Sequence, residues 1–137
     1  MVTTPTGKPV AMVHCNNCCT DLDYWVKLFI EFSSLSGNNL TKGEIYDLLY
    51  NEALKGDSDC GKIVSINYFS GEPVTGFLQG RPMVLRSENS NFNLANFMRT
   101  HIYSAVATLK IGMEILEEEM SILISLWVTA VCLRQNM

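Results

Sequence analysis

The sequence predicts one α/β domain built from layers of strands and helices. The chain has 137 residues, of which 47% are hydrophobic and 18% are charged, a balance typical of a folded chain that buries a core. Short segments in which apolar and polar residues alternate are separated by longer segments of helical period. Their order is strand, helix, helix, strand, loop, helix, strand, which is typical of an α/β domain.

The first two elements are a short strand and an amphipathic helix. Val10–Val13 is an apolar stretch that predicts the strand, and Cys15–Thr20 predicts the loop after it. Thr20-Asp21-Leu22-Asp23 has the form of a capping box, in which side chains accept hydrogen bonds from the free N–H groups of a helix start. The helix ends near Gly37, and its apolar stripe comprises Leu22, Trp25, Val26, Phe29 and Phe32.

A second helix and a second strand follow. Thr41-Lys42-Gly43-Glu44 is another capping box, and Gly56 marks the end of the helix that it opens. The polar segment from Gly56 to Gly61 predicts a turn, and the alternating pattern of Ile63–Phe69 predicts a strand. The apolar stripe of this helix comprises Ile45, Leu48, Leu49 and Ala53.

The C-terminal half holds the longest predicted helix. Ser70–Asn93 is rich in glycine and proline and predicts a loop, with a short strand at Met83–Leu85. Asn93 is placed to cap a helix that runs to about Glu119, and the apolar run Ile122–Leu133 predicts a further buried element. The apolar stripe of the long helix comprises Leu94, Phe97, Met98, Ile102, Ala105, Val106, Leu109, Met113 and Leu116.

Composition excludes several functional classes. The formal net charge is −4 and the basic residues are scattered, so nucleic acid is not an expected partner. The longest apolar run is too short to span a bilayer, and no basic-then-apolar signal opens the chain. We therefore expect a cytoplasmic protein with no membrane partner.

Three cysteines cluster ahead of the first helix. Cys15, Cys18 and Cys19 lie together, whereas Cys60 and Cys132 stand alone, and the odd total disfavours a disulfide framework. A zinc site needs about four ligands, and half of that set has no visible source, so no metal site is predicted. A C-x-x-C between a strand and a helix N-terminus also suits a redox pair, because the helix dipole stabilises a thiolate. The interpretation that we prefer is a loop that contains small buried thiols.

Residue types and spacing reveal no catalytic constellation. The phosphate-binding patterns G-x-x-x-x-G-K-[ST] and G-x-G-x-x-G are absent from the sequence. Ser70-Gly71-Glu72 is interpreted as part of a turn, and His101, a lone histidine on the long helix, is expected to be structural. Residue types and spacing alone indicate a cytosolic α/β domain and no specific activity.

Four stretches of the chain nevertheless resemble one family in their individual residues as well as in their pattern. They are PVAMVHCNNC at 9–18, NYFSGEPVTG at 67–76, NFNLANFMR at 91–99 and ATLKIGM at 107–113. These stretches resemble bacterial FGGY carbohydrate kinases of the xylulokinase-like branch, and the resemblance runs from Met1 to about Glu118.

The resemblance implies a partial ribonuclease H-like (actin-like ATPase) domain with a mixed sheet packed with helices. Members of the family have two such domains around a cleft, and they use ATP and Mg²⁺ to phosphorylate a sugar. The N-terminal domain supplies a phosphate loop and the carboxylate that takes the proton of the sugar hydroxyl. Because this chain resembles only the middle of the C-terminal domain, we expect a fragment of a kinase for xylulose or a related ketose or sugar. We expect this fragment to be inactive alone, and we expect neither ATP nor Mg²⁺ to bind to it tightly.

The resemblance also implies one candidate site. In the family, the junction between the first strand and the first helix faces the nucleotide cleft, which makes Asn16, Asn17, Thr20 and Asp21 the candidate nucleotide-cleft residues. Ordinary helix capping explains Thr20 and Asp21 without any ligand. No catalytic residue and no metal ligand is assigned in this chain.

The end of the chain departs from the family pattern. The family continues with a strand and a motif such as M-G-H-G-G-L-F-K-T, whereas residues 126–137 read LWVTAVCLRQNM. One of the nucleotide sequences that could encode this segment, when read in a shifted frame, encodes M-G-H-G-G-L-F-K-T-K. We therefore interpret residues 121–137 as a frameshifted tail, the alternative being a genuine final strand of an unrelated small protein.

A partial domain predicts self-association. Uncovered apolar surface and unpaired strand edges favour a homo-oligomer. Two other functions stay open at this point. One is a small thiol-redox module that uses Cys15 and Cys18, and the other is a non-catalytic module that binds a partner of the parent kinase.

Overall fold

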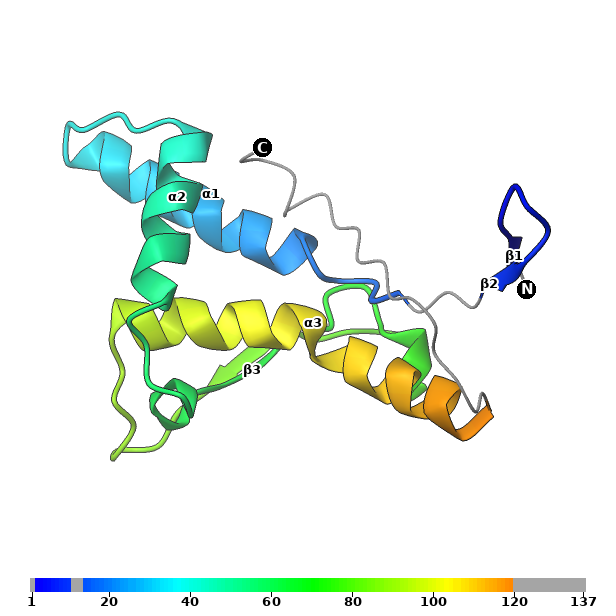
Figure 1. Cartoon of the computed structure of the whole chain (residues 1–137). Coiled ribbons are helices and arrows are strands. Elements are labelled where there is room, and N and C mark those ends of the chain that lie inside the picture. Colours follow the sequence, from blue (N-terminus) through cyan, green and yellow to red (C-terminus); the bar gives the residue numbers. More distant parts are fainter. Residues whose placement is uncertain (1, 11–13, 120–137) are drawn as a thin grey trace.

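The computed structural model describes residues 2–10 and 14–119, and it confirms the α/β class (Figure 1). The predicted element at 122–133 and most of the predicted strand at 10–13 lie outside the described residues. In chain order the elements are β1 (Val2–Thr3), β2 (Pro9–Val10), α1 (Thr20–Leu35), α2 (Lys42–Ala53), the 3-10 turn η1 (Cys60–Lys62), β3 (Val64–Ile66), the 3-10 turn η2 (Pro73–Thr75), β4 (Met83–Leu85) and α3 (Leu94–Glu119).

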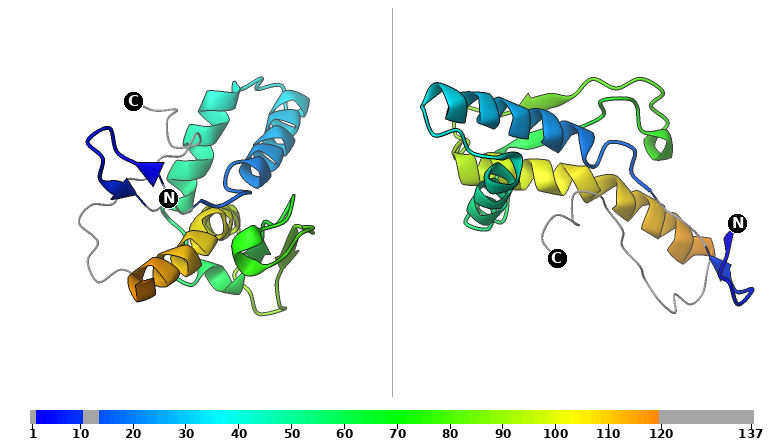
Figure 2. Two further views of the ribbon diagram at one scale, coloured as in Figure 1. Left: turned by 90° about the vertical axis from the view of Figure 1, so that its right-hand side faces the viewer. Right: turned by 90° about the horizontal axis from the view of Figure 1, so that it is seen from above.

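α3 is the element against which most of the others pack. It contacts α1, α2, β3 and both 3-10 turns. The rotated views show α2 and the β3–β4 hairpin on different sides of α3, with α1 running beside it (Figure 2). The three helices therefore share one core, and the hairpin covers a separate face of α3.

The strands form two small antiparallel sheets. β1 pairs with β2, and β3 pairs with β4 in a register that places Val64 opposite Leu85 and Ile66 opposite Met83. A larger mixed sheet is not present among residues 2–10 and 14–119. β3 is also shorter than the predicted strand at 63–69, because Asn67 turns the chain: its carbonyl accepts a hydrogen bond from the N–H of Phe69 at 2.6 Å.

The core lies where the three helices meet. The apolar stripes predict most of it, but Phe32, Leu48, Leu94 and Val106 were wrongly assigned to buried faces and are exposed. Each helix buries only the arc that faces its neighbours, and these four lie outside that arc. The buried cluster comprises Leu22, Val26, Ile45, Tyr46, Leu49, Ala53, Met98 and Ala105.

Two of the three predicted helix starts are confirmed. The Thr41 hydroxyl accepts a hydrogen bond from the N–H of Glu44, whose carboxylate accepts one from the N–H of Thr41, so the capping box is complete. Asn93 Oδ1 accepts a hydrogen bond from the N–H of Asn96 at 2.8 Å. The capping box at Thr20 is wrong, because Cys19 occupies the N-cap position and no side chain caps α1.

A left-handed turn ahead of β3 is held by one buried amide. Cys60, Gly61 and Lys62 have φ of 54°, 61° and 61°, a region that costs about 1–2 kcal/mol for each non-glycine residue. Asn96 is fully buried and accepts a hydrogen bond from the N–H of Asp57 at 2.7 Å. Its Nδ2 donates to the Asp57 carboxylate at 2.8 Å and to the carbonyl of Asn91 at 2.9 Å. The N–H of Asn91 in turn donates to the carbonyl of Gly61 at 2.9 Å, so these bonds attach the strained turn to α3.

Truncating Met98 tests the position of the core. Met98 is fully buried on α3, so we expect Met98→Ala to lower the free energy of unfolding by about 2–5 kcal/mol, since a cavity is left behind. Met83→Ala is the matched control, because Met83 is 45% exposed and should change stability little. Urea unfolding followed by circular dichroism measures both. Equal losses for the two variants would contradict this placement of the core.

Candidate functional site

The loop that leads into α1 is joined to a distant turn by one buried asparagine. Asn17 is 1% exposed, and its Oδ1 accepts hydrogen bonds from the N–H of Ser70 at 2.9 Å and from the Ser70 hydroxyl at 3.1 Å. Its Nδ2 donates to the carbonyl of Gly71 at 2.6 Å. Both ends of the amide are therefore used to hold the two segments together.

Asn16 reinforces this contact from the surface. Its Nδ2 lies 3.1 Å from the Ser70 hydroxyl and 3.3 Å from the carbonyl of Gly71. Its backbone N–H donates to Oε2 of Glu72 at 3.0 Å. The side chain is exposed, unlike that of Asn17, so it can also meet solvent or a ligand.

Glu72 is the buried acid of this contact. It is 1% exposed, and besides Asn16 it lies within 3.5 Å of Nδ2 of Asn17. Its N–H donates to the carbonyl of Phe77 at 2.8 Å, which closes the turn around η2. Gly71 has φ of 85°, and a Cβ there would meet the Leu78 carbonyl oxygen at 2.6 Å, so only glycine fits.

In the first turn of α1, Asp21 forms a second buried polar contact. The Asp21 carboxylate lies 3.0 Å from Nδ1 of His101 on α3, and both side chains are almost fully buried. The Ser65 hydroxyl of β3 lies 3.1 Å from the same Nδ1. In a hydrolase triad, serine contacts one ring nitrogen of the histidine and aspartate contacts the other. Here both contact Nδ1, so this arrangement is not a catalytic triad.

The imidazole of His101 is enclosed by aromatic rings. Its centroid lies 4.5 Å from that of Phe97 and 5.0 Å from that of Trp25. His101 Nε2 and Trp25 Nε1 are buried without a hydrogen-bond partner in the described part of the chain. The side chain that the sequence predicted to be structural is therefore at the meeting point of α1, β3 and α3.

The four candidate nucleotide-cleft residues fall into two groups in the structure. Asn16 and Asn17 both contact the Ser70–Glu72 turn, whereas Asp21 faces His101 and Thr20 is exposed without a capping role. Sequence reasoning missed Glu72, Ser70 and His101 as the partners of these residues. The signal was the quoted resemblance of residues 67–76, which was interpreted only as a turn.

The junction does not fit ATP or Mg²⁺ by itself. An uncapped helix N-terminus attracts phosphate, but here Asp21 and Asp23 occupy the first turn and Glu72 lies beside the loop. The carboxylates of Asp21 and Glu72 are buried and already hydrogen-bonded, so neither is available to a hydrated cation. We derive no phosphoryl-transfer step from these residues.

The surroundings of Cys15 do not favour a reactive thiolate. Burial raises the pKa of the Cys15 thiol above its ordinary value; a hydrogen bond with Cys18 works in the opposite direction, and the negative charge of Glu72 raises the pKa further. A reactive cysteine needs a lowered pKa. Cys60 is also buried, and burial raises its pKa.

Residues 2–10 and 14–119 contain no group of three or more histidine, cysteine, aspartate or glutamate side chains arranged to hold a metal ion. In the same part of the chain, no helix has the length and hydropathy of a membrane-spanning segment.

Comparison with known proteins gives one match. The sequence model described as "FGGY family of carbohydrate kinases, C-terminal domain" matches residues 1–129. No curated protein and no solved structure matches the chain. The matched region includes both segments of the candidate site and reaches beyond the resemblance noted to about Glu118.

Replacing Asn17 tests whether the contact with the Ser70–Glu72 turn is structural. Asn17→Ala leaves the Ser70 N–H and the Gly71 carbonyl without this partner, so we expect a loss of about 1–3 kcal/mol in the free energy of unfolding. Asn16→Ala is the control, since its side-chain bonds lie nearer the surface and should cost less. Thermal denaturation compares the two, and a larger loss for Asn16→Ala would contradict the assignment.

The pH dependence of alkylation tests the Cys15 environment. Thiolate is the reacting form, and a raised pKa means that the rate at Cys15 reaches its half-maximum at a higher pH than in a model peptide. Glu72→Gln removes one negative charge and should lower that midpoint. Mass spectrometry of iodoacetamide-treated peptides measures it. A midpoint below that of the model peptide would favour the redox interpretation.

Proposed function

We propose, from the premise that this chain belongs to the FGGY family of carbohydrate kinases, that it is a part of a sugar kinase that does not transfer phosphate alone. The observation that carries the proposal is the match of residues 1–129 to the C-terminal domain of that family. Kinases of this family use ATP and Mg²⁺ to phosphorylate a carbohydrate, so the parent activity is ATP-dependent sugar phosphorylation.

Two features support the absence of activity in the isolated chain. The sequence holds no glycine-rich phosphate loop of the usual patterns. Asp21, which is one of the candidate nucleotide-cleft residues, and Glu72, which lies beside them, are both hydrogen-bonded inside the protein. A phosphoryl-transfer site needs carboxylates that can hold Mg²⁺ or take the proton of the acceptor hydroxyl.

The finer proposal places the parent enzyme in the xylulokinase-like branch, with xylulose or a related ketose as substrate and a cytoplasmic location. The quoted stretches at 9–18 and 67–76 support it, and the structure joins these two stretches through Asn16 and Asn17. In this proposal the domain is of the ribonuclease H-like type. Asn16 and Thr20, which are exposed, border the nucleotide cleft of the whole enzyme. Asn17 and Asp21, which are buried, hold the backbone of this border in place.

Two further properties belong to the same proposal. Residues 121–137 are a frameshifted tail, for which the alternative reading of residues 126–137 is the support. The chain also self-associates, because large apolar side chains such as Leu28, Phe32 and Leu35 are exposed.

A kinase assay tests the central proposal. The full chain is mixed with MgATP and a panel of ketoses, aldoses and polyols, and ADP release is followed, with an intact sugar kinase as the positive control. We expect no sugar-dependent ADP release above the blank, because the sequence holds no phosphate loop of the usual patterns and the carboxylates of Asp21 and Glu72 are already hydrogen-bonded. Sugar-dependent ADP formation that rises in proportion to the chain concentration would contradict the inactivity.

A further inference from the structure

α1 carries two apolar faces, and only one of them packs into the core. Leu22 and Val26 are buried against the other helices. The second face is exposed and comprises Tyr24 (50%), Leu28 (51%), Phe32 (68%) and Leu35 (88%). Steps of four, four and three residues place these side chains in one stripe along the helix, which we call the α1 stripe.

The α1 stripe continues onto the neighbouring turn. The rings of Tyr24 and Phe69 are stacked, with centroids 4.8 Å apart and an angle of 21° between the planes, and Phe69 is itself 40% exposed. From Tyr24 to Leu35 the stripe extends for about 17 Å along the helix at 1.5 Å per residue. Contiguous apolar surface of this extent marks an interaction site.

Two opposite charges flank the α1 stripe on one side. Lys27 and Glu31 are exposed, and at 100° per residue both fall on the same flank of the helix. A lysine four residues before a glutamate is the less favourable order for a pair within one helix, and no ion pair joins these two in the described part of the chain. Lys27 Nζ lies 4.9 Å from the centroid of the Tyr24 ring, directly beside the stripe.

We propose that the α1 stripe binds the α1 stripe of a second copy of this chain in an antiparallel pair. A twofold axis across such a pair brings the same patch of each copy together, so the flank that carries Lys27 and Glu31 meets itself. The midpoint between Lys27 and Glu31 is Phe29, and the midpoint of the stripe falls between Phe29 and Ile30. One axis therefore centres the apolar contact and places Lys27 of each copy opposite Glu31 of the other.

This inference rests on the self-association proposed above and gives it a surface, but it does not depend on the parent enzyme being a sugar kinase. The contact is a single helix pair, which buries less surface than a standard interface, in which each partner buries about 800 Å². We therefore expect a dissociation constant of about 1–100 µM, which corresponds to a weak specific association. Sedimentation velocity on the full chain across this concentration range measures the dimer.

An apolar substitution tests the stripe. Leu35→Glu places a charge at the seam and should abolish the dimer, since a carboxylate there would be buried without a partner. Leu78→Glu is the matched control, because Leu78 is also 88% exposed but lies on the loop before β4, so this variant should dimerise like the original chain. Circular dichroism verifies that both variants are folded.

A charge exchange tests the antiparallel register. Lys27→Glu alone or Glu31→Lys alone replaces both attractive pairs by repulsive ones, and each should weaken self-association about tenfold. An equimolar mixture of the two variants restores both attractive pairs and should dimerise as tightly as the original chain. High salt should reduce the difference between the variants and the mixture.

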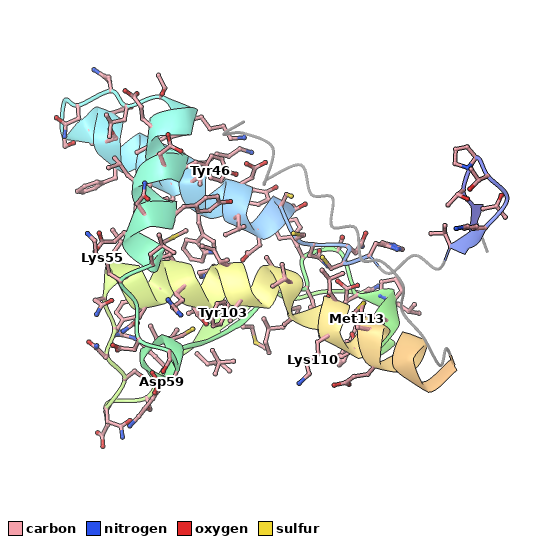
Figure 3. All side chains as sticks on the ribbon, viewed as in Figure 1. Tyr46, Lys55, Asp59, Tyr103, Lys110 and Met113 are labelled. Carbon is pink, nitrogen blue, oxygen red and sulfur yellow. The ribbon has the colours of Figure 1, made fainter. Side chains whose placement is uncertain are left out.

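The matched control for charge lies on α3. Lys110 and Glu114 have the same order and spacing, and Lys110 points away from α1 in Figure 3. Lys110→Glu and Glu114→Lys should leave the dimer unchanged. A dimer that persists unaltered in Leu35→Glu and Lys27→Glu overturns this surface while leaving self-association intact. If the original chain is a monomer at every concentration, both the proposed surface and the proposed self-association are overturned.

Discussion

The buried contact of Asp21 with His101 is the interaction on which the arrangement of this domain depends. It joins the first turn of α1 to the N-terminal half of α3, and the Ser65 hydroxyl adds β3 to the same imidazole nitrogen. Apolar packing alone would tolerate a shift of α1 along α3. A shift of one turn would leave a carboxylate and an imidazole buried and unpaired, at about 1–3 kcal/mol or more for each group. Polar pairing therefore sets the register in which the core side chains meet.

The same register decides what the candidate site can do. Once Asp21 faces α3, the loop before it turns toward residues 70–72, and Asn17 fills the space between the two segments. The polar groups that a ligand would need are used for internal hydrogen bonds, and the exposed groups that are left are Asn16 and Thr20. These hydrogen bonds hold the loop before α1 against residues 70–72 and α1 against α3, within the region that matches the C-terminal domain of the FGGY family.

Local patterns predicted the local structure well. Apolar stripes located all three helices, and the Thr41–Glu44 and Asn93 caps were confirmed because capping involves residues three positions apart. The Thr20 cap failed because the chain enters α1 through Cys19 in a helical conformation, which no composition rule reveals. The contacts of Asn17 with Gly71 and of Asp21 with His101 span 54 and 80 residues, so only the packed chain shows them. Phe32 was misassigned because an apolar residue at helical spacing fits an exposed stripe as well as a buried one.

Reading the genomic DNA across codons 117–137 and on both sides of the reading frame tests the kinase-fragment account most directly. The account predicts that the shifted frame after codon 120 encodes M-G-H-G-G-L-F-K-T, and that a phosphate loop and an N-terminal kinase domain are encoded upstream. A shifted frame without the glycine-rich motif, with no kinase sequence upstream, would contradict it. The chain would then share only ancestry with the sugar kinases.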